Sequence, residues 1–152
     1  MSDLPYRAAR IRRATARLCG LLDWVPLHEV SLANGRRADI LALRPDGGFV
    51  CIEIKSGLRD FQVDQKWPEY RHFADTLYFA VDADFPQHLL PGDVGIIVAE
   101  DGEAALLRDG VDHTLAPARR RAMTLRFALL AGRRLGALED PDGAGSRILK
   151  AD

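Results

Sequence analysis

Apolar positions at the start of the chain repeat with the spacing of a helix. Ile11, Ala14 and Leu18 fall on one side of a 3.6-residue repeat, and Pro5 suits a first helical turn. The pattern predicts a helix over residues 5–22. A neighbouring stripe on this helix holds three arginines, Arg10, Arg13 and Arg17. The stripe is either a solvated polar face or a surface that contacts DNA phosphates, and the sequence leaves both interpretations open.

Three short apolar segments follow, separated by turn residues. Asn34-Gly35 and the run from Pro45 to Gly48 are strong turn signals. The pattern therefore predicts an antiparallel meander of three strands, over residues 27–32, 38–43 and 49–56.

The second half of the chain mixes helical and strand patterns. A loop is predicted at 57–60, then a helix over 61–74 that Pro68 kinks or restarts. Further elements are predicted in chain order: strands over 76–82 and 95–99, short edge pieces at 104–108 and 113–115, and a last helix over 117–138. Together the elements indicate an α/β fold, an α+β sandwich whose helices flank a mixed central sheet of about five strands.

Length and composition place these elements in one domain. The chain has 152 residues, 47% hydrophobic and 28% charged, which is ordinary for a globular protein. We expect a single domain over residues 1–140 and a flexible C-terminal tail over 141–152. The net charge of −1 excludes binding of nucleic acid through overall charge. Two cysteines without metal-binding spacing, and no apolar run of membrane-spanning length, favour a cytoplasmic protein away from the membrane.

The third predicted strand carries two opposite charges on one face. Side chains alternate along a strand, so Glu53 and Lys55 share a side. A simple ion pair at a strand end explains these two residues alone. Asp39 changes the picture, because it lies seven residues before the turn centre near residue 46, and Glu53 lies seven after it. Antiparallel pairing across that turn would bring Asp39 beside Glu53 and Lys55.

Two neighbouring carboxylates and a lysine suit phosphodiester hydrolysis. Carboxylates bind Mg²⁺ or Mn²⁺, which polarises a phosphate and activates a water, and the lysine stabilises the developing charge. Glu29, on the first strand, is a candidate further acid, although a hydrated strand residue is the simpler interpretation. The four histidines show no ligand spacing.

These motifs are similar to those of a known family. The residues are Ala38-Asp39-Ile40, Glu53-Ile54-Lys55-Ser56, Asp60-Phe61, the run from Asp64 to Tyr70, and the run from Arg119 to Phe127. They resemble the MmcB-related DNA repair family of bacteria, within the PD-(D/E)XK nuclease superfamily. The resemblance implies a restriction-endonuclease-like core, with Asp39 and Glu53 as metal ligands, the Ile54 carbonyl as a third ligand, and Lys55 as the catalytic lysine.

The resemblance also leaves two roles open. Many superfamily members carry an acid on the first helix, which this helix lacks, so Glu29 must substitute or the role is absent. Some relatives use a glutamine after the lysine motif, and Gln65 or Gln62 fits equally.

The segment after the site adds candidate DNA contacts. Lys66 and Tyr70 are four residues apart and share a helical face, and with Arg59 and Trp67 they suit a phosphate backbone or an unpaired base. For Trp67 and Tyr70 the alternative is packing.

The sequence therefore predicts a magnesium- or manganese-dependent deoxyribonuclease acting in DNA repair. The alternative is a non-catalytic DNA-binding or accessory subunit that retains the nuclease fold. Expected partners are DNA, a second copy of the chain in a homodimer, and other repair proteins. The DNA structure that is recognised, the polarity of cutting and the number of metal ions do not follow from the sequence.

Overall fold

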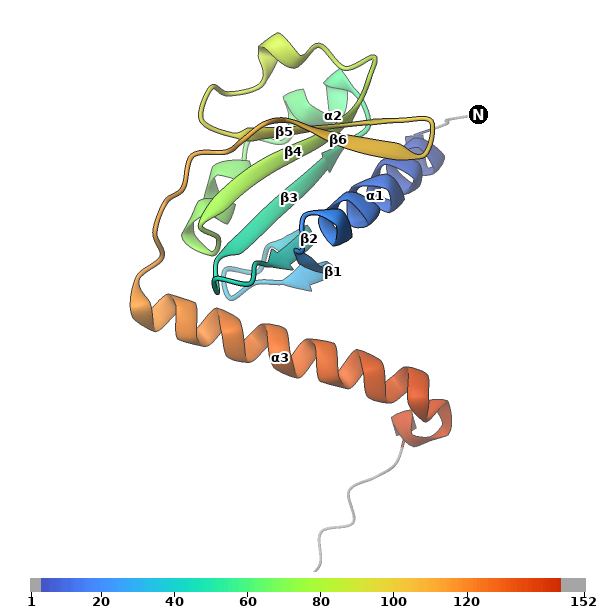
Figure 1. The fold of residues 1–152 in the computed structure, drawn as a ribbon, viewed down its shortest axis with the longest axis vertical. Helices are drawn as coiled ribbons and strands as arrows, with labels where there is room; N and C mark the ends of the chain where they lie inside the picture. Colours follow the sequence, from blue (N-terminus) through green and yellow to red (C-terminus); the bar gives the residue numbers. More distant parts are fainter. Residues whose placement is uncertain (1–3, 146–152) are drawn as a thin grey trace, which may run out of the picture. The chain divides into compact units, whose positions relative to one another are not determined.

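The computed structural model describes residues 4–145, which form two compact parts, residues 4–116 and 117–145. The first part is built on one mixed sheet of six strands in the spatial order β1-β2-β3-β4-β5-β6 (Figure 1). Its strands are β1 (Val25–Ser31), β2 (Arg37–Leu43), β3 (Phe49–Lys55), β4 (Thr76–Asp82), β5 (Gly95–Glu100) and β6 (Glu103–Arg108). The predicted mixed α and β class is confirmed, with six strands in place of about five.

Pairing directions divide the sheet into three zones. β1, β2 and β3 form the predicted antiparallel meander, β3, β4 and β5 run parallel, and β6 returns antiparallel to β5. The two tight turns of the meander contain Gly35 at φ 82° and Gly47 at φ 85°, a left-handed conformation that glycine adopts without strain. The turn signals therefore set the register of β2 against β3.

Helix α1 (Leu4–Leu21) covers one face of the sheet (Figure 1). Its apolar stripe of Ile11, Ala14 and Leu18 is buried against alternate strand residues, among them Ile52 and Ile54 of β3. Because side chains alternate along β3, Glu53 and Lys55 project to the opposite face. The core thus leaves the two charged residues on the side of the sheet away from α1.

The connection from β3 to β4 differs from the single helix predicted over 61–74. Helix α2 (Leu58–Val63) starts within the predicted loop and has Asp64 as its C-cap, and a 3₁₀ helix, η1 (Trp67–His72), begins one residue before Pro68. Asp64 is extended, and its Oδ1 accepts a hydrogen bond from the amide of Lys66 at 2.9 Å. This local turn interrupts the helical path, and Pro68 occupies the first turn of the new helix.

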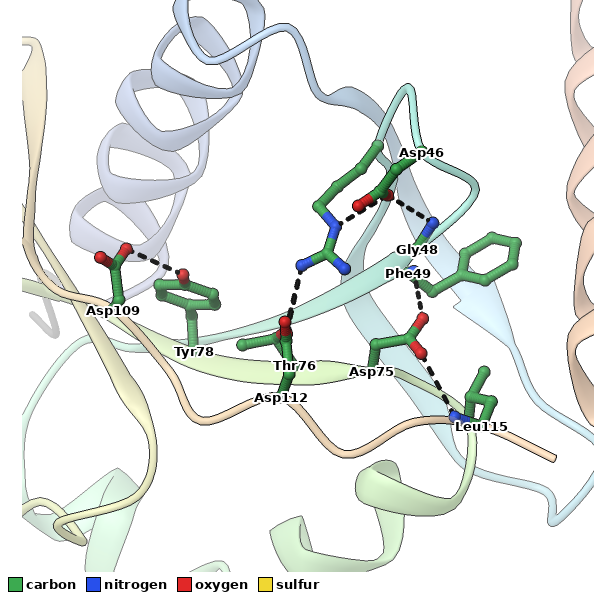
Figure 2. Close-up of polar contacts among 10 residues, drawn as sticks. Asp46, Gly48, Phe49, Asp75, Thr76, Tyr78, Asp109, Asp112 and Leu115 are labelled. Carbon is green, nitrogen blue, oxygen red and sulfur yellow. Dashed lines mark hydrogen bonds and ion pairs between the residues drawn. The ribbon is translucent and has the colours of Figure 1, made fainter.

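Residues 113–115 form no strand, contrary to prediction, but are held by a buried carboxylate. Asp75, 4% exposed, accepts hydrogen bonds from the amides of Phe49 at 2.7 Å and Leu115 at 3.2 Å (Figure 2). The carbonyl of Asp75 also accepts from the amide of His113. Side-chain and turn contacts replace the ladder that the pattern suggested. A further short 3₁₀ helix, η2 (Gln87–Leu89), precedes β5.

The second part contains helix α3 (Pro117–Glu139), which confirms the predicted last helix, and the short 3₁₀ helix η3 (Pro141–Gly145). The rest of the predicted tail lies outside the described residues. Within residues 4–145, no helix is both long enough and apolar enough to cross a bilayer.

Candidate active site

The register of β2 against β3 brings the two predicted acids together. Ile40 pairs with Ile52, so Asp39 and Glu53 follow as the next opposed positions. The amide of Asp39 donates to Glu53 Oε1 at 3.2 Å, and the amide of Ile54 donates to Asp39 Oδ2 at 2.9 Å. The count across the turn predicted that the two acids lie close together, and the structure adds that each carboxylate accepts from the backbone of the other strand.

Glu53 is the most strongly perturbed acid of this group. Its residue is 4% exposed, and burial, followed by the nearby charge of Asp39, raises its pKa to about 9. The Asp39 amide and the charge of Lys55 oppose that rise without cancelling it. The Cys51 thiol, 3.9 Å from Glu53 Oε1, has its own pKa raised well above the ordinary value by burial and by these acids. The buried acid Glu53 therefore lies beside the partly buried Asp39, with too little positive charge near Glu53 to offset its burial.

Lys55 lies on the same face of β3 as Glu53, but its ammonium group pairs with acids that follow β3 in the chain. Its Nζ is 2.7 Å from Asp64 Oδ2 and 4.0 Å from Asp60 Oδ1, and its side chain is 6% exposed. Partial burial raises the pKa of Asp64, yet the hydrogen bonds from Lys55 and from the Lys66 amide outweigh it, so the net shift is downward. Asp60 in turn accepts from the amide of Ser56 at 3.4 Å.

Asp64 was not among the predicted site residues. A signal for it exists in the sequence, because Asp60 and Asp64 are four residues apart directly after the lysine motif. Acids at that spacing share a helical face. The carbonyl of Ile54, which the family resemblance assigns to a metal, stays a prediction.

Glu29 does not join the two acids as a third ligand. Its backbone is left-handed, at φ 51°, and its Oε1 accepts a hydrogen bond from Arg12 of α1 at 3.3 Å. Across residues 4–145, no group of three or more histidine, cysteine, aspartate or glutamate side chains lies close enough to hold a metal. Asp39 and Glu53 are therefore a two-carboxylate pair.

The arginine stripe of α1 lies on the other side of the sheet from the acids. Arg10, Arg13 and Arg17 are all exposed, which agrees with either interpretation of the stripe. Arg17 Nη1 donates to the carbonyl of Gly102 at 3.3 Å, and Arg10 stacks over the ring of Tyr6 at 5.7 Å. These contacts do not involve Asp39 or Glu53.

The predicted DNA contacts after the site fall into two kinds. Lys66 and Gln65 are exposed, and Gln65 Nε2 donates to the carbonyl of Gln62 at 2.6 Å. Tyr70 is buried and donates its hydroxyl to the carbonyl of Arg37 at 3.0 Å. Trp67 packs edge-on against Phe79, with Arg71 over its ring. The two aromatic residues thus serve packing, and Lys66 and Gln65 remain accessible.

Comparison with known proteins places this arrangement in a family. A family model described as "DNA repair protein MmcB-like" matches residues 2–142. The solved structure of the SPO1766 protein of unknown function from Silicibacter pomeroyi is 38% identical, with a TM-score of 0.86 over 95% of this chain and 97% of that chain. No curated protein matches the chain. Since the family model covers nearly all of the sequence, this protein belongs to the MmcB-like family of DNA repair proteins.

Proposed function

We propose that this DNA repair protein is a metal-dependent nuclease of the PD-(D/E)XK type, which hydrolyses DNA phosphodiester bonds at Asp39, Glu53 and Lys55. One observation carries the proposal: Glu53 is buried beside a second carboxylate, and its pKa is raised to about 9. Two carboxylates this close repel each other unless a proton or a cation accompanies them. An arrangement so unfavourable for folding supports a role in binding a cation.

Magnesium or manganese suits the donor set at this position. Mg²⁺ favours carboxylate oxygens and is commonly held by one or two of them together with several waters. Asp39 and Glu53 would hold the ion, and the two-carboxylate pair favours one ion over two. When bound, the ion would supply polarisation of a phosphate oxygen and a lowered pKa for a water.

Lys55 would contribute a positively charged side chain to this site. Its ammonium lies on the same face of β3 as Glu53 and carries three protons, of which Asp64 engages one. The others can donate to a phosphate oxygen or orient the attacking water, which stabilises the charge that develops as the bond breaks. Hydrolysis then adds water across one phosphorus–oxygen bond, leaving a phosphate monoester and a hydroxyl.

A non-catalytic DNA-binding or accessory subunit is the second candidate. The 2.7 Å ion pair between Lys55 and Asp64 favours it, because a lysine already paired in this way is less available to phosphate. Such a subunit would bind DNA without metal and leave the strand intact.

A cleavage assay on labelled single-stranded, duplex and branched DNA, with Mg²⁺ or Mn²⁺, separates the two candidates. We expect wild type to cut at least one substrate, and Glu53→Gln and Lys55→Ala to lose more than about hundredfold in rate. Glu103→Gln, an exposed residue at the β6 edge, is the matched control and should cut like wild type. Cutting that survives in both site variants would indicate a contaminant. Metal-independent binding without cutting would favour the accessory role.

A further inference from the structure

The ammonium group of Lys55 is fixed by Asp64, an acid that was not among the predicted site residues. The side chain of Lys55 is 6% exposed, and its Nζ lies 2.7 Å from Asp64 Oδ2. A lysine side chain has four rotatable bonds, so its charged end is poorly placed unless something holds it. In this protein the hold comes from outside β3, from the residue that ends α2.

Asp64 is itself held in place by the backbone on both sides. Its amide donates to the carbonyl of Asp60 at 3.3 Å, closing the last turn of α2. Its Oδ1 accepts from the amide of Lys66 at 2.9 Å, while Oδ2 receives Lys55. The Asp64 carboxylate thus accepts from the Lys66 amide through one oxygen and from the Lys55 ammonium through the other. The hydrogen bond to Lys55 is short and part-buried.

We propose that Asp64 is a positioning residue of the site, which sets the Lys55 ammonium against the Asp39–Glu53 pair. The inference rests on the nuclease function proposed above and adds a residue to it. With one proton of the ammonium on Asp64, the rest are directed away from Asp64, where they can meet a phosphate oxygen or a water. Asp64 touches no reacting atom, so its effect passes entirely through Lys55.

Asp60 provides a natural comparison for Asp64. Both acids lie within 4.0 Å of Lys55 Nζ, but Asp60 is at the limit of that distance and its side chain is 43% exposed, against 23% for Asp64. Replacing either acid by its amide removes one negative charge near Lys55. Only at Asp64 do both oxygens accept hydrogen bonds, from Lys55 and from the Lys66 amide, so its amide variant has one acceptor for two donors and the ammonium is no longer held in the same way. An effect of charge alone would appear in both variants, whereas positioning would appear in one.

The test measures cleavage by Asp64→Asn, Asp64→Glu and Asp60→Asn, with kcat and KM determined separately. We expect Asp64→Asn to lower kcat about ten- to hundredfold with KM within about twofold, since a misplaced group of this kind costs that much. Asp64→Glu should recover most of the rate, and Asp60→Asn should stay within about threefold of wild type. Equal losses in the two amide variants, or faster cutting by Asp64→Asn, would overturn the proposal; the faster rate would mean that Asp64 restrains Lys55.

A second measurement separates this proposal from the nuclease function itself. Urea denaturation of Lys55→Met, Asp64→Asn and the double variant tests whether the ion pair forms in solution, without any need for activity. We expect the double variant to lose less stability than the sum of the single losses. Additive losses would overturn the positioning role even if wild type cuts DNA. Non-additive losses beside an inactive wild type would place the failure in the proposed nuclease function, and the role in catalysis would fall with it.

Discussion

An acid is buried to the same extent at each end of strand β3, but the two acids have different hydrogen-bond partners and different neighbouring charges. Asp75, beside the start of β3, and Glu53, near its end, are both 4% exposed. Asp75 divides its two oxygens between the amides of Phe49 and Leu115 (Figure 2). Glu53 receives one backbone amide and faces a second carboxylate, Asp39.

The difference teaches that burial alone does not mark a functional acid. Near Asp75, Arg44 forms ion pairs with both Asp46 and Asp112, and Thr76 donates to Asp112. At Asp75 the two donated amides replace the water that burial removes. At Glu53 the compensation is incomplete, and the raised pKa is the physical sign of it. The first acid stabilises the fold, and the second is the acid to which the proposed function assigns a cation.

The largest effect on stability is expected from Asp75→Ala. Removing this carboxylate leaves two backbone amides without their acceptor, in a place that water does not reach. Each such group costs about 1–3 kcal/mol, so we expect the free energy of unfolding to drop by about 2–6 kcal/mol. Urea denaturation measures the drop, with exposed Asp84→Ala as the control. A loss below about 1 kcal/mol would mean that Asp75 does not stabilise the fold through its two backbone hydrogen bonds.

Glu53→Gln is expected to raise the free energy of unfolding, whereas Asp75→Ala lowers it. The pKa of Glu53 is about 9 in the folded protein against an ordinary 4.5, so the folded state binds the extra proton between these values. Its contribution to stability therefore falls as pH rises from about 5 to 9. The amide stays neutral throughout and removes that fall. At pH 8 we expect the free energy of unfolding of Glu53→Gln to exceed that of wild type by about 2–4 kcal/mol.

Denaturation at pH 5 and pH 8 checks the sign of this effect. Near pH 5 the wild-type carboxyl is protonated, so the two proteins should differ little. Glu103→Gln, whose parent residue is exposed, should track wild type at both values. Equal stability of wild type and Glu53→Gln at pH 8 would show that Glu53 is compensated as fully as Asp75.

The strand register around the acids could be predicted because short turns fix it. Asn34-Gly35 and the Pro45–Gly48 turn leave little freedom in pairing β1, β2 and β3, so the position of Asp39 beside Glu53 follows from counting. The apolar alternation of β3 then assigns Glu53 and Lys55 to one face. Local rules therefore sufficed for the acid pair.

Other parts of the site depend on contacts that local rules do not contain. The partner of Lys55 is set by where the chain goes after β3, and the break at residues 64–66 arises from a side-chain turn at Asp64 as well as from Pro68. Glu29 has a left-handed backbone, which is uncommon outside glycine and which the strand pattern gave no reason to expect. Its pairing with Arg12 needs the packing of α1 on the sheet. Tertiary structure, more than propensity, decided these residues.

The smallest effect concerns the surface beside the acid pair. Lys66 is exposed and lies two residues beyond Asp64, so we predict that it contacts a DNA phosphate. Lys66→Ala should then lower affinity severalfold and reduce the salt slope of duplex binding by about 0.9, the value for one phosphate contact. Binding is measured by fluorescence anisotropy over a range of salt in EDTA, where no metal-dependent cutting intervenes.

Arg13→Ala makes the prediction sharper, because Arg13 is equally exposed but lies on α1, across the sheet from Glu53. If DNA rests only on the face of the acids, Arg13→Ala leaves the salt slope unchanged and Lys66→Arg restores it. An equal reduction from both alanine variants would mean that the duplex reaches around the sheet edge to the arginine stripe. An unchanged salt slope in Lys66→Ala would mean that Lys66 does not contact DNA. DNA would then have to approach the Asp39–Glu53 pair from a side other than that of the segment between α2 and η1.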